Sequence, residues 1–318
     1  MPTRNDPILH VQNLSFAYAK APVLDDLSFA VGRGATGLLG PNGAGKSTLI
    51  KILLGFLKPG AGGGSVLGYP IGKSGSRIRQ RVGYLPEHDC LIPSLKAVRL
   101  VTYCGELCGM PWSEAMQRAH EVLFYVGLGE ARYREVGTFS AGMKQRIKLA
   151  QALVHAPEIL FLDEPTNGLD PAGRREMLAL IKDIVAQGQT SVIFSSHILH
   201  DVEIACADVV MIKKGRLVVS GNIEALKRKD QIVYEVRLKG DRESFLRSLA
   251  REGGRCDHSR HDLIKIVLPP RRSAEMIFRV AQQTGVQVRH LMHQRDSLED
   301  VFIEAVEETE KTRMKAEG

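Results

Sequence analysis

The pattern of apolar and polar positions changes near residue 35. Before it, alternating apolar and polar residues predict two short strands, 8–18 and 23–31, separated by a turn at 20–22. After it come a short apolar strand, TGLLG, a glycine-rich loop and the helical run KSTLIKILLGFL. A strand, a loop and a helix in this order indicate an α/β domain with parallel strands.

Residues 94–136 interrupt this alternation with two helical patterns, SLKAVRLVTYCGELCG and SEAMQRAHEVLFYVGL. Each opens with a serine, Ser94 or Ser113, of the kind that caps a helix. We therefore predict a helical insertion at about 90–156. The α/β pattern then resumes with the apolar strands EILFLDE and TSVIFSSH, and the hairpin DVVMIKKGRLVVSG, with Lys214 and Gly215 at its turn, closes the domain.

After the charged stretch KRKD at 227–230, short strands and helices alternate. Strands IVYEVRL, LIKIVLP and VQVRHLMH each precede a helical pattern, and Asp241, Ser273 and Ser297 stand where helix caps belong. We predict a first domain at 1–229, a separate small α+β domain at 230–308 and a charged tail at 309–318.

Composition places the chain among ordinary globular proteins, with 318 residues, 44% hydrophobic and 25% charged. No secretory signal is visible, and no run approaches the roughly 20 apolar residues that span a bilayer. Five cysteines without paired CxxC spacing favour a reducing, cytosolic compartment. The net charge of +7 is spread over scattered basic residues without a nucleic-acid-binding motif, so we expect a solvated basic surface and no nucleic-acid partner.

The sharpest chemical signal is GPNGAGKST, which fits the phosphate-binding pattern GxxxxGK[ST] between a strand and a helix. Its backbone N–H groups enclose phosphates, Lys46 reaches the β and γ phosphates, and the Ser47 hydroxyl suits Mg²⁺. The predicted nucleotide-binding residues here are Gly40, Pro41, Asn42, Gly43, Ala44, Gly45, Lys46, Ser47 and Thr48.

Two further strand ends carry candidate chemistry. Asp163 and Glu164 follow a buried strand, where Asp163 suits the magnesium site and Glu164 could activate water as a general base. An acidic pair after a strand is otherwise typical of a turn or a helix cap. His197 ends the strand TSVIFSSH, where it could donate a hydrogen bond to the γ phosphate or simply be structural. Tyr18 could stack on a base or be an ordinary strand tyrosine.

The stretch GTFSAGMKQR predicts a second, weaker anion site. Ser140 is a good helix N-cap and Gly142 allows close approach, while Pro157 stops the helix. A helix start favours an anion by only about 0.3 to 1 kcal/mol from its dipole, and this one lacks a P-loop lysine. A weak phosphate site far from a strong one makes sense if the two meet when two chains pack head to tail.

The motifs GPNGAGKST, FSAGMKQR, ILFLDEPTNGLD and SSH occur in that order, and this set resembles the ATP-binding subunit of ABC transporters over about residues 8–225. The resemblance implies a P-loop NTPase fold of the ABC ATPase type, with an antiparallel β subdomain and a helical insertion. It implies an ATPase that uses ATP and Mg²⁺. Its implied partners are a second ATP-binding subunit, as a homodimer, and an integral membrane permease that holds it at the cytoplasmic face of the membrane.

The same resemblance implies roles for single residues. Ser140, Ala141 and Gly142 belong to the signature motif that contacts the γ phosphate held by the partner subunit, and Asp170 lies at the dimer interface. His197 falls on the switch histidine and Tyr18 on the adenine-stacking aromatic. The carboxy-terminal module, ending in SLEDVFIEAV, looks like the accessory domain of exporter-type subunits of the drug, antibiotic or sodium efflux kind.

Two positions depart from the family pattern. The signature reads FSAGM instead of LSGGQ, so Ala141 brings a β-carbon toward phosphate and requires helical dihedral angles. Glu87, in VGYLPEHDC, stands where the family usually has a magnesium-sensing glutamine. We expect Glu87 to remain on the metal side and its charge to raise the pKa of a neighbouring carboxyl group, Asp163 or Glu164.

Two other functions fit parts of the sequence. A non-transport ABC ATPase acting on nucleic acid or ribosomes usually carries coiled-coil insertions, zinc elements or two ATPase halves, none of which is visible in the sequence. A nucleotide sensor without turnover is disfavoured by the intact set Lys46, Asp163, Glu164 and His197.

Overall fold

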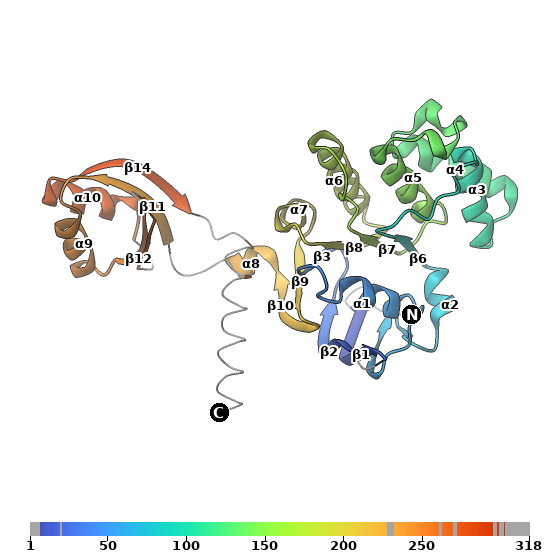
Figure 1. Cartoon of the computed structure of the whole chain (residues 1–318), viewed down its shortest axis with the longest axis horizontal. Coiled ribbons are helices and arrows are strands. Elements are labelled where there is room, and N and C mark those ends of the chain that lie inside the picture. Colours follow the sequence, from blue (N-terminus) through green and yellow to red (C-terminus); the bar gives the residue numbers. More distant parts are fainter. Residues whose placement is uncertain are drawn as a thin grey trace. The chain divides into compact units, whose positions relative to one another are not determined.

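The computed structural model describes residues 7–19, 21–227, 232–260, 263–269 and 272–294, together with 298 and 302. These residues divide between Ile223 and Glu224 into two compact units (Figure 1). The domain limits drawn from the sequence, at 229/230 and 308/309, stay a prediction. None of the helices in the described ranges has the length and apolar character that crossing a bilayer requires.

The first unit begins with an antiparallel sheet in the strand order β2-β1-β4-β5. Its strands are β1 (Leu9–Tyr18), β2 (Ala21–Val31), β4 (Ala61–Val66) and β5 (Tyr69–Pro70). The predicted strand pair is confirmed, and β2 begins two residues earlier than expected. The hydrophobic pattern does not predict β4, whose sequence is AGGGSV. A β-carbon on Gly64, which has φ +156°, would lie 2.0 Å from the His10 carbonyl oxygen, so glycine is needed for β4 to approach β1.

The second sheet has six strands in the order β10-β9-β3-β8-β7-β6. They are β3 (Ala35–Leu39), β6 (Val82–Leu85), β7 (Ile159–Asp163), β8 (Ser191–Ser196), β9 (Asp208–Lys213) and β10 (Arg216–Asn222). All neighbours pair in parallel except β9 and β10, which form the predicted hairpin. Strands β3, β7 and β8 are buried throughout, which confirms a sheet covered on both faces.

Helices cover both faces of this sheet. α1 (Lys46–Leu53) lies between the two sheets, and its buried side chains share one core with strands of both. On the other face lie α5 (Ala141–Leu153), α6 (Pro171–Ala186) and α7 (Leu199–Ala205) (Figure 1). The unit also contains α2 (Gly75–Arg79), and α8 (Ile223–Lys227) lies at its limit. This α/β architecture agrees with the predicted fold class.

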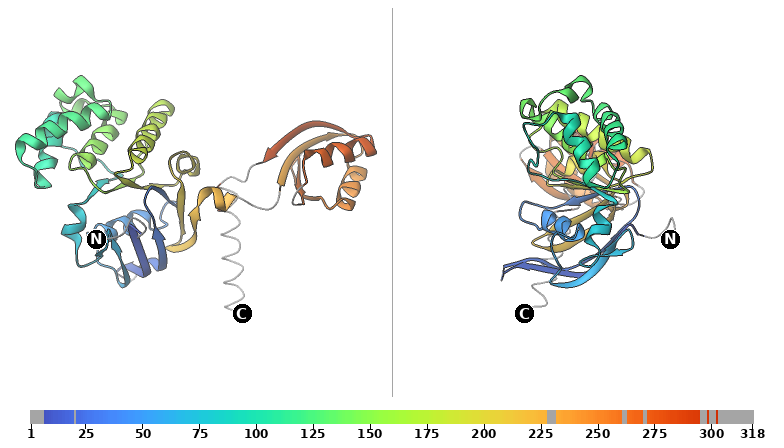
Figure 2. Two further views of the ribbon diagram at one scale, coloured as in Figure 1. Left: turned by 180° about the vertical axis from the view of Figure 1, so that it is seen from behind. Right: turned by 90° about the vertical axis from the view of Figure 1, so that its right-hand side faces the viewer.

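The helical insertion contains α3 (Ala97–Leu107), α4 (Trp112–Tyr125) and the 3₁₀ helices η1 (Gly129–Tyr133) and η2 (Val136–Thr138), followed by α5. Figure 2 shows this green group on the side of the six-stranded sheet away from the blue antiparallel sheet. The predicted serine caps are wrong. α3 is preceded by Lys96 and α4 by Pro111, and neither makes a side-chain capping bond. Pro111 occupies the N-cap position of α4, with φ −58°, a value that its ring favours. Ser113 is therefore already inside the helix and cannot be its cap.

The second unit is a four-stranded antiparallel sheet with two helices, in the strand order β12-β13-β11-β14. Its elements are β11 (Ile232–Lys239), α9 (Arg242–Arg251), β12 (Arg255–Arg260), β13 (Leu263–Leu268), α10 (Ala274–Thr284) and β14 (Gln287–Gln294). The alternating elements predict all of these except the polar strand β12. Asp241 caps α9 through Ser244 N, while Ser273 precedes α10 without a side-chain bond. The predicted cap Ser297 and most of the last predicted helix lie outside the described residues.

Candidate functional site

The glycine-rich loop Gly40–Thr48 joins β3 to α1 with geometry that requires glycine. Gly45 has φ +102°, and a β-carbon there would lie 2.6 Å from Leu24 Cδ2. At Gly40 a β-carbon would lie 2.3 Å from the Ile212 carbonyl oxygen, which belongs to β9. The loop is therefore packed against two strands and holds its backbone in one conformation at the start of α1, as a phosphate-binding loop requires.

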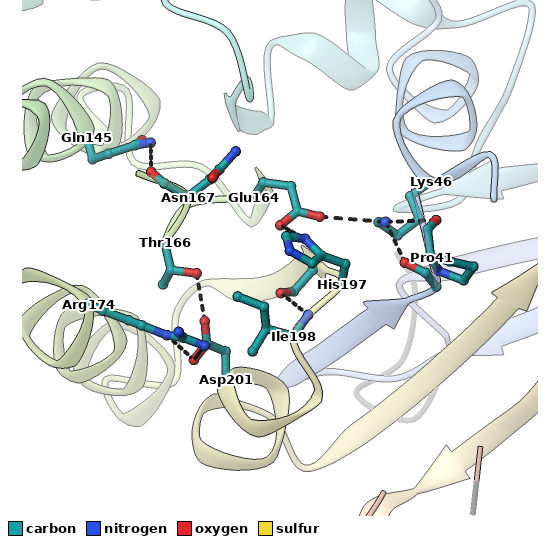
Figure 3. A network of polar contacts seen from close by, with 12 residues as sticks. Pro41, Lys46, Gln145, Glu164, Thr166, Asn167, Arg174, His197, Ile198 and Asp201 are labelled. Atoms are coloured by element: carbon teal, nitrogen blue, oxygen red, sulfur yellow. Dashed lines mark hydrogen bonds and ion pairs between the residues drawn. The ribbon is translucent and has the colours of Figure 1, made fainter. Parts of the chain in front are cut away.

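Lys46, the first residue of α1, curls its side chain back over this loop. The ammonium donates to the Gly40 carbonyl oxygen at 2.7 Å and to the Pro41 carbonyl oxygen at 3.4 Å. Its Nζ atom also lies 3.6 Å from Glu164 Oε1, and both side chains are only 7% exposed (Figure 3). The cation is thus fixed between the loop and a carboxylate, in a site from which most water is excluded.

Glu164 follows β7 and is held in a left-handed conformation, with φ +51°. Its backbone N–H still donates to Ser195 O of β8 at 3.0 Å, so the sheet anchors it. A non-glycine residue in this region costs about 1 to 3 kcal/mol, and such costs concentrate at functional sites. The turn carries the carboxylate out of the sheet edge and toward Lys46 (Figure 3).

His197 follows β8 and contacts the other carboxylate oxygen of Glu164. The Nδ1 atom lies 2.9 Å from Glu164 Oε2, and the imidazole is 41% exposed. The structure thus brings Lys46, Glu164 and His197 into one chain of polar contacts, as their positions at strand ends predict. In this arrangement the histidine orients the carboxylate, a contact that the sequence did not indicate.

Asp163, the last residue of β7, is 1% exposed, and its Oδ1 atom has no hydrogen-bond partner within the described residues. Burial raises the pKa of its carboxyl group. The nearby Ser47 and Ser195 hydroxyls lower it, the charge of Glu87 raises it and that of Lys46 lowers it, and the net pKa is above the usual value. The expectation that Glu87 raises a neighbouring carboxyl pKa is confirmed for Asp163. A buried carboxylate oxygen without a donor, beside a serine hydroxyl, fits a divalent cation that prefers oxygen ligands.

Glu87 lies just beyond β6 on an exposed loop whose backbone is hydrogen-bonded to a buried lysine. Lys148 of α5 is 2% exposed and donates to the carbonyl oxygens of Pro86 and Glu87 at 3.0 and 3.2 Å. It also forms an ion pair with Asp89 at 3.4 Å. The Glu87 loop is thereby joined to α5, the helix that begins at the second predicted anion site. Sequence reasoning missed Lys148, although a lysine among the apolar positions of a buried helix was the available signal.

Ser140 caps α5, since its hydroxyl accepts a hydrogen bond from Met143 N at 3.3 Å, which confirms the predicted cap. Ala141 is the first helical residue, so it has the helical dihedral angles that its β-carbon requires. A cleft of about 320 Å³ lies beside it, lined by residues that include Glu87, Ala141 and Gly168. Within the described residues no hydrogen bond joins the stretch Ser140–Gly142 to Lys46, Glu164 or His197.

Asp170 begins α6 as its N-cap and accepts a hydrogen bond from Gly173 N at 2.8 Å. It is exposed, as are Ser140, Ala141 and Gly168. Tyr18, at the end of β1, is 46% exposed and makes an edge contact with Phe16 at 4.9 Å between ring centroids. Three of the residues predicted to meet a second subunit, Ser140, Ala141 and Asp170, thus lie at the surface, while Gly142 is half-buried. The Tyr18 ring, predicted to stack on the adenine, also lies at the surface.

A buried polar network behind the site was not predicted. Asp201 of α7 is fully buried, and its carboxylate accepts hydrogen bonds from Thr166 Oγ1 and Arg174 Nε, both at 2.7 Å (Figure 3). Arg174 Nη2 adds a contact of 2.6 Å. Thr166 lies two residues after Glu164, and α7 follows His197, so the network ties together both segments that carry the polar chain. The i, i+4 spacing of Asp201 with buried Ala205 was the signal that the carboxylate faces inward.

The chain resembles known proteins over most of its length. The profile of the family described as "ABC transporter" matches residues 24–167. A linearmycin resistance ATP-binding protein of Bacillus subtilis is 38% identical over 249 residues, which cover 76% of this chain and 80% of that protein. A daunorubicin resistance ATP-binding protein of Streptomyces coeruleorubidus is 31% identical over 94% of this chain and 95% of its own. A solved structure titled "Structure of ATP binding subunit of ABC transporter" has a TM-score of 0.63 and 30% identity, covering 70% of this chain and 92% of that one.

Proposed function

This chain belongs to the ABC transporter family as an ATP-binding, ATP-hydrolysing subunit that works with a membrane permease, and we propose that two copies hydrolyse ATP in sites shared between them. Each site would combine the glycine-rich loop of one chain with Ser140, Ala141 and Gly142 of the other. The observation that supports hydrolysis is the polar chain Lys46–Glu164–His197, which places a buried carboxylate beside the phosphate loop. The observation that supports sharing is the exposure of Ser140, Ala141 and Asp170.

Binding of the triphosphate falls to the loop Gly40–Thr48 and to Lys46. A phosphate that enters the loop competes with the Gly40 and Pro41 carbonyl oxygens for the ammonium, which can turn toward it without leaving its buried position. The exposed ring of Tyr18 offers an aromatic face for the adenine.

Magnesium is the cation that we assign to Asp163 and Ser47, with Glu87 as a further carboxylate on the metal side. The unpartnered Oδ1 atom of Asp163 supports this assignment. When bound, Mg²⁺ neutralises phosphate charge and so favours phosphoryl transfer. It would also offset the repulsion by which Glu87 raises the pKa of Asp163.

Glu164 is the general base in this account. Its Oε2 atom is oriented by His197 Nδ1 and its Oε1 atom by Lys46, so the carboxylate is held in one rotamer before substrate arrives. It accepts the proton of the attacking water, while Lys46 stabilises charge on the phosphate oxygens. His197 acts as a positioning residue for Glu164 and, being 41% exposed, remains accessible to a phosphate.

The second subunit completes the site through an exposed surface. Ser140, Ala141, Gly168 and Asp170 are close in the fold, polar or small, and exposed. A helix start alone binds phosphate weakly, so this surface contributes when the partner's loop already holds ATP. ATP binding would thus close the pair, and hydrolysis would open it.

Export is the direction of transport that we propose, with the chain at the cytoplasmic face of the membrane beside its permease. The relatives named for linearmycin and daunorubicin resistance support this direction, and the match to the second of them extends over the carboxy-terminal unit. We assign cargo recognition to the permease, because the described site is built for phosphate.

The experiment that tests Glu164 as the general base is the substitution Glu164→Gln, measured by phosphate release with ATP and Mg²⁺. The amide keeps the size of the side chain but cannot take up the proton, so we expect turnover to fall by about 100-fold or more while ATP binding remains. Asp183→Asn, on the exposed side of α6, serves as a matched acid-to-amide control. Normal phosphate release by Glu164→Gln would overturn the assignment.

A further inference from the structure

The part of the chain that runs from the end of β2 to just beyond β6 carries charge of one sign only. From residue 27 to residue 86 the chain contains no aspartate or glutamate. The same 60 residues contain eight basic side chains, namely Arg33, Lys46, Lys51, Lys58, Lys73, Arg77, Arg79 and Arg81. The scattered basic residues elsewhere are mixed with acids, so this segment holds a surplus of positive charge comparable to the net charge of the whole chain.

The fold concentrates part of this charge around a cavity of about 610 Å³ at the junction of α1 and α2. Lys73, Arg77 and Arg79 line it together with the hydroxyl-bearing residues Ser74 and Ser76, and no acidic residue contributes to the lining. Lys73 and Arg77 are exposed, and no ion pair to either is formed among the described residues. Cations with serine hydroxyls and without carboxylates are the chemistry that recognises phosphate groups.

The cavity depends on close contact between the ends of the two helices. Gly55 follows α1 with φ +74°, and a β-carbon on it would lie 2.7 Å from the Cα atom of Gly75, the first residue of α2. This contact brings Arg79 to the end of α1, where Nη1 donates to the Leu54 carbonyl oxygen at 3.0 Å. The guanidinium is therefore oriented in advance at the cavity wall.

An exposed aromatic ring adjoins the basic cavity. Phe56 is 56% exposed, and the Arg79 Cζ atom lies over its ring at 5.2 Å from the centroid. Lys51 and Lys58, also exposed, flank this ring in the sequence. Basic side chains around an aromatic anchor are typical of surfaces that bind the headgroup region of a lipid bilayer.

We propose that the basic cavity between α1 and α2, with Phe56 beside it, binds the phosphate headgroups of anionic phospholipids. The chain works next to a membrane permease, so a lipid surface is within reach of the subunit. Lys73 and Arg77 would contact headgroup phosphates, Arg79 would hold one from the cavity wall, and Phe56 would enter the interface. This contact would add to the attachment that the permease provides. The proposal goes beyond ATP hydrolysis and uses none of the residues assigned to it.

The test is co-sedimentation of the full chain with vesicles of phosphatidylcholine alone, and with vesicles of about three parts phosphatidylcholine to one part phosphatidylglycerol. We expect binding to the anionic vesicles only. The double substitution Lys73→Gln/Arg77→Gln should weaken it roughly 30-fold, the factor that corresponds to about 1 kcal/mol for each of two charges at an anionic surface. The matched control Lys182→Gln/Arg237→Gln removes two exposed charges elsewhere and should leave binding within about 3-fold.

Four outcomes would overturn the proposal. These are equal binding to both kinds of vesicle, equal loss in the double variant and in the control, displacement by inorganic phosphate at constant ionic strength, and binding of RNA in preference to vesicles. Displacement by inorganic phosphate would identify a soluble phosphate as the ligand. Preferential binding of RNA would identify a nucleic acid as the ligand. Phosphate release from ATP, measured on the same preparations, reports fold and hydrolysis separately. Loss of vesicle binding with unchanged hydrolysis therefore concerns the cavity alone.

Discussion

The buried carboxylate of Asp201 makes Arg174→Met the most informative substitution for stability. Asp201 is fully buried and Arg174 supplies two of its contacts, at 2.7 and 2.6 Å. Removing one partner of a buried ion pair costs about 3 to 5 kcal/mol, because the remaining charge is left uncompensated. Arg174 is 31% exposed and Thr166 still donates to the carboxylate, so the lower end, about 3 kcal/mol, applies.

In thermal unfolding followed by circular dichroism, a loss of about 3 kcal/mol in a unit of this size lowers Tm by about 6 to 12 °C. The next residue, Arg175, is exposed and has no ion pair among the described residues, so Arg175→Met should change stability by less than about 0.5 kcal/mol. The double substitution Arg174→Met/Asp201→Asn should recover much of the loss, because it also removes the buried charge. Equal Tm values for Arg174→Met and Arg175→Met would refute the reasoning.

Three further predictions concern pH, the phosphate loop and magnesium. Burial lowers the pKa of His155, so the unfolded chain binds a proton at higher pH than the folded protein does. The free energy of unfolding therefore falls as the pH drops below about 6.5. His155→Gln should reduce the fall in Tm between about pH 7.5 and pH 5.5. Gly40→Ala should weaken binding of a fluorescent ATP analogue by at least about 10-fold, because its β-carbon meets the Ile212 carbonyl oxygen. Gly32→Ala, at a glycine with no atom within 4 Å and no positive φ, should leave that binding unchanged. Glu87→Gln should shift the Mg²⁺ concentration for half-maximal phosphate release by about 10-fold, and an unchanged value would contradict a role on the metal side.

Much of the fold follows from local patterns along the chain. Continuous apolar runs predict β7 and β8, and the phosphate-loop motif predicts the turn from β3 into α1. The hydrophobic pattern does not predict β4 or β12, and the physical reasons differ. β4 is rich in glycine, and its pairing depends on the close approach of β1, whereas β12 is a polar strand that shows no hydrophobic alternation.

The candidate site also has residues that the sequence predicts and contacts that it does not predict. Lys46, Glu164 and His197 are predictable because each stands at the end of a parallel strand or begins the helix after one, and such ends meet at one edge of a sheet. The contacts that hold them are not predictable, because they join residues far apart in the sequence. Lys148 meets Pro86 across 62 positions and Asp201 meets Thr166 across 35. Only the folded arrangement shows that these buried charges have partners.

The central claim, an ATP site shared between two chains, is tested most directly by mixing two inactive variants. Lys46→Ala should disable the phosphate loop at the start of α1, and Ser140→Arg should disable the start of α5, which we propose contacts the partner's ATP. In a head-to-tail pair of one variant with the other, one site carries both lesions and the second site is intact. An equal mixture should therefore regain about one quarter of the wild-type phosphate release, since half of the pairs are mixed and each holds one good site. A mixture as inactive as either variant alone, or a Ser140→Arg chain that hydrolyses ATP normally, would contradict the account.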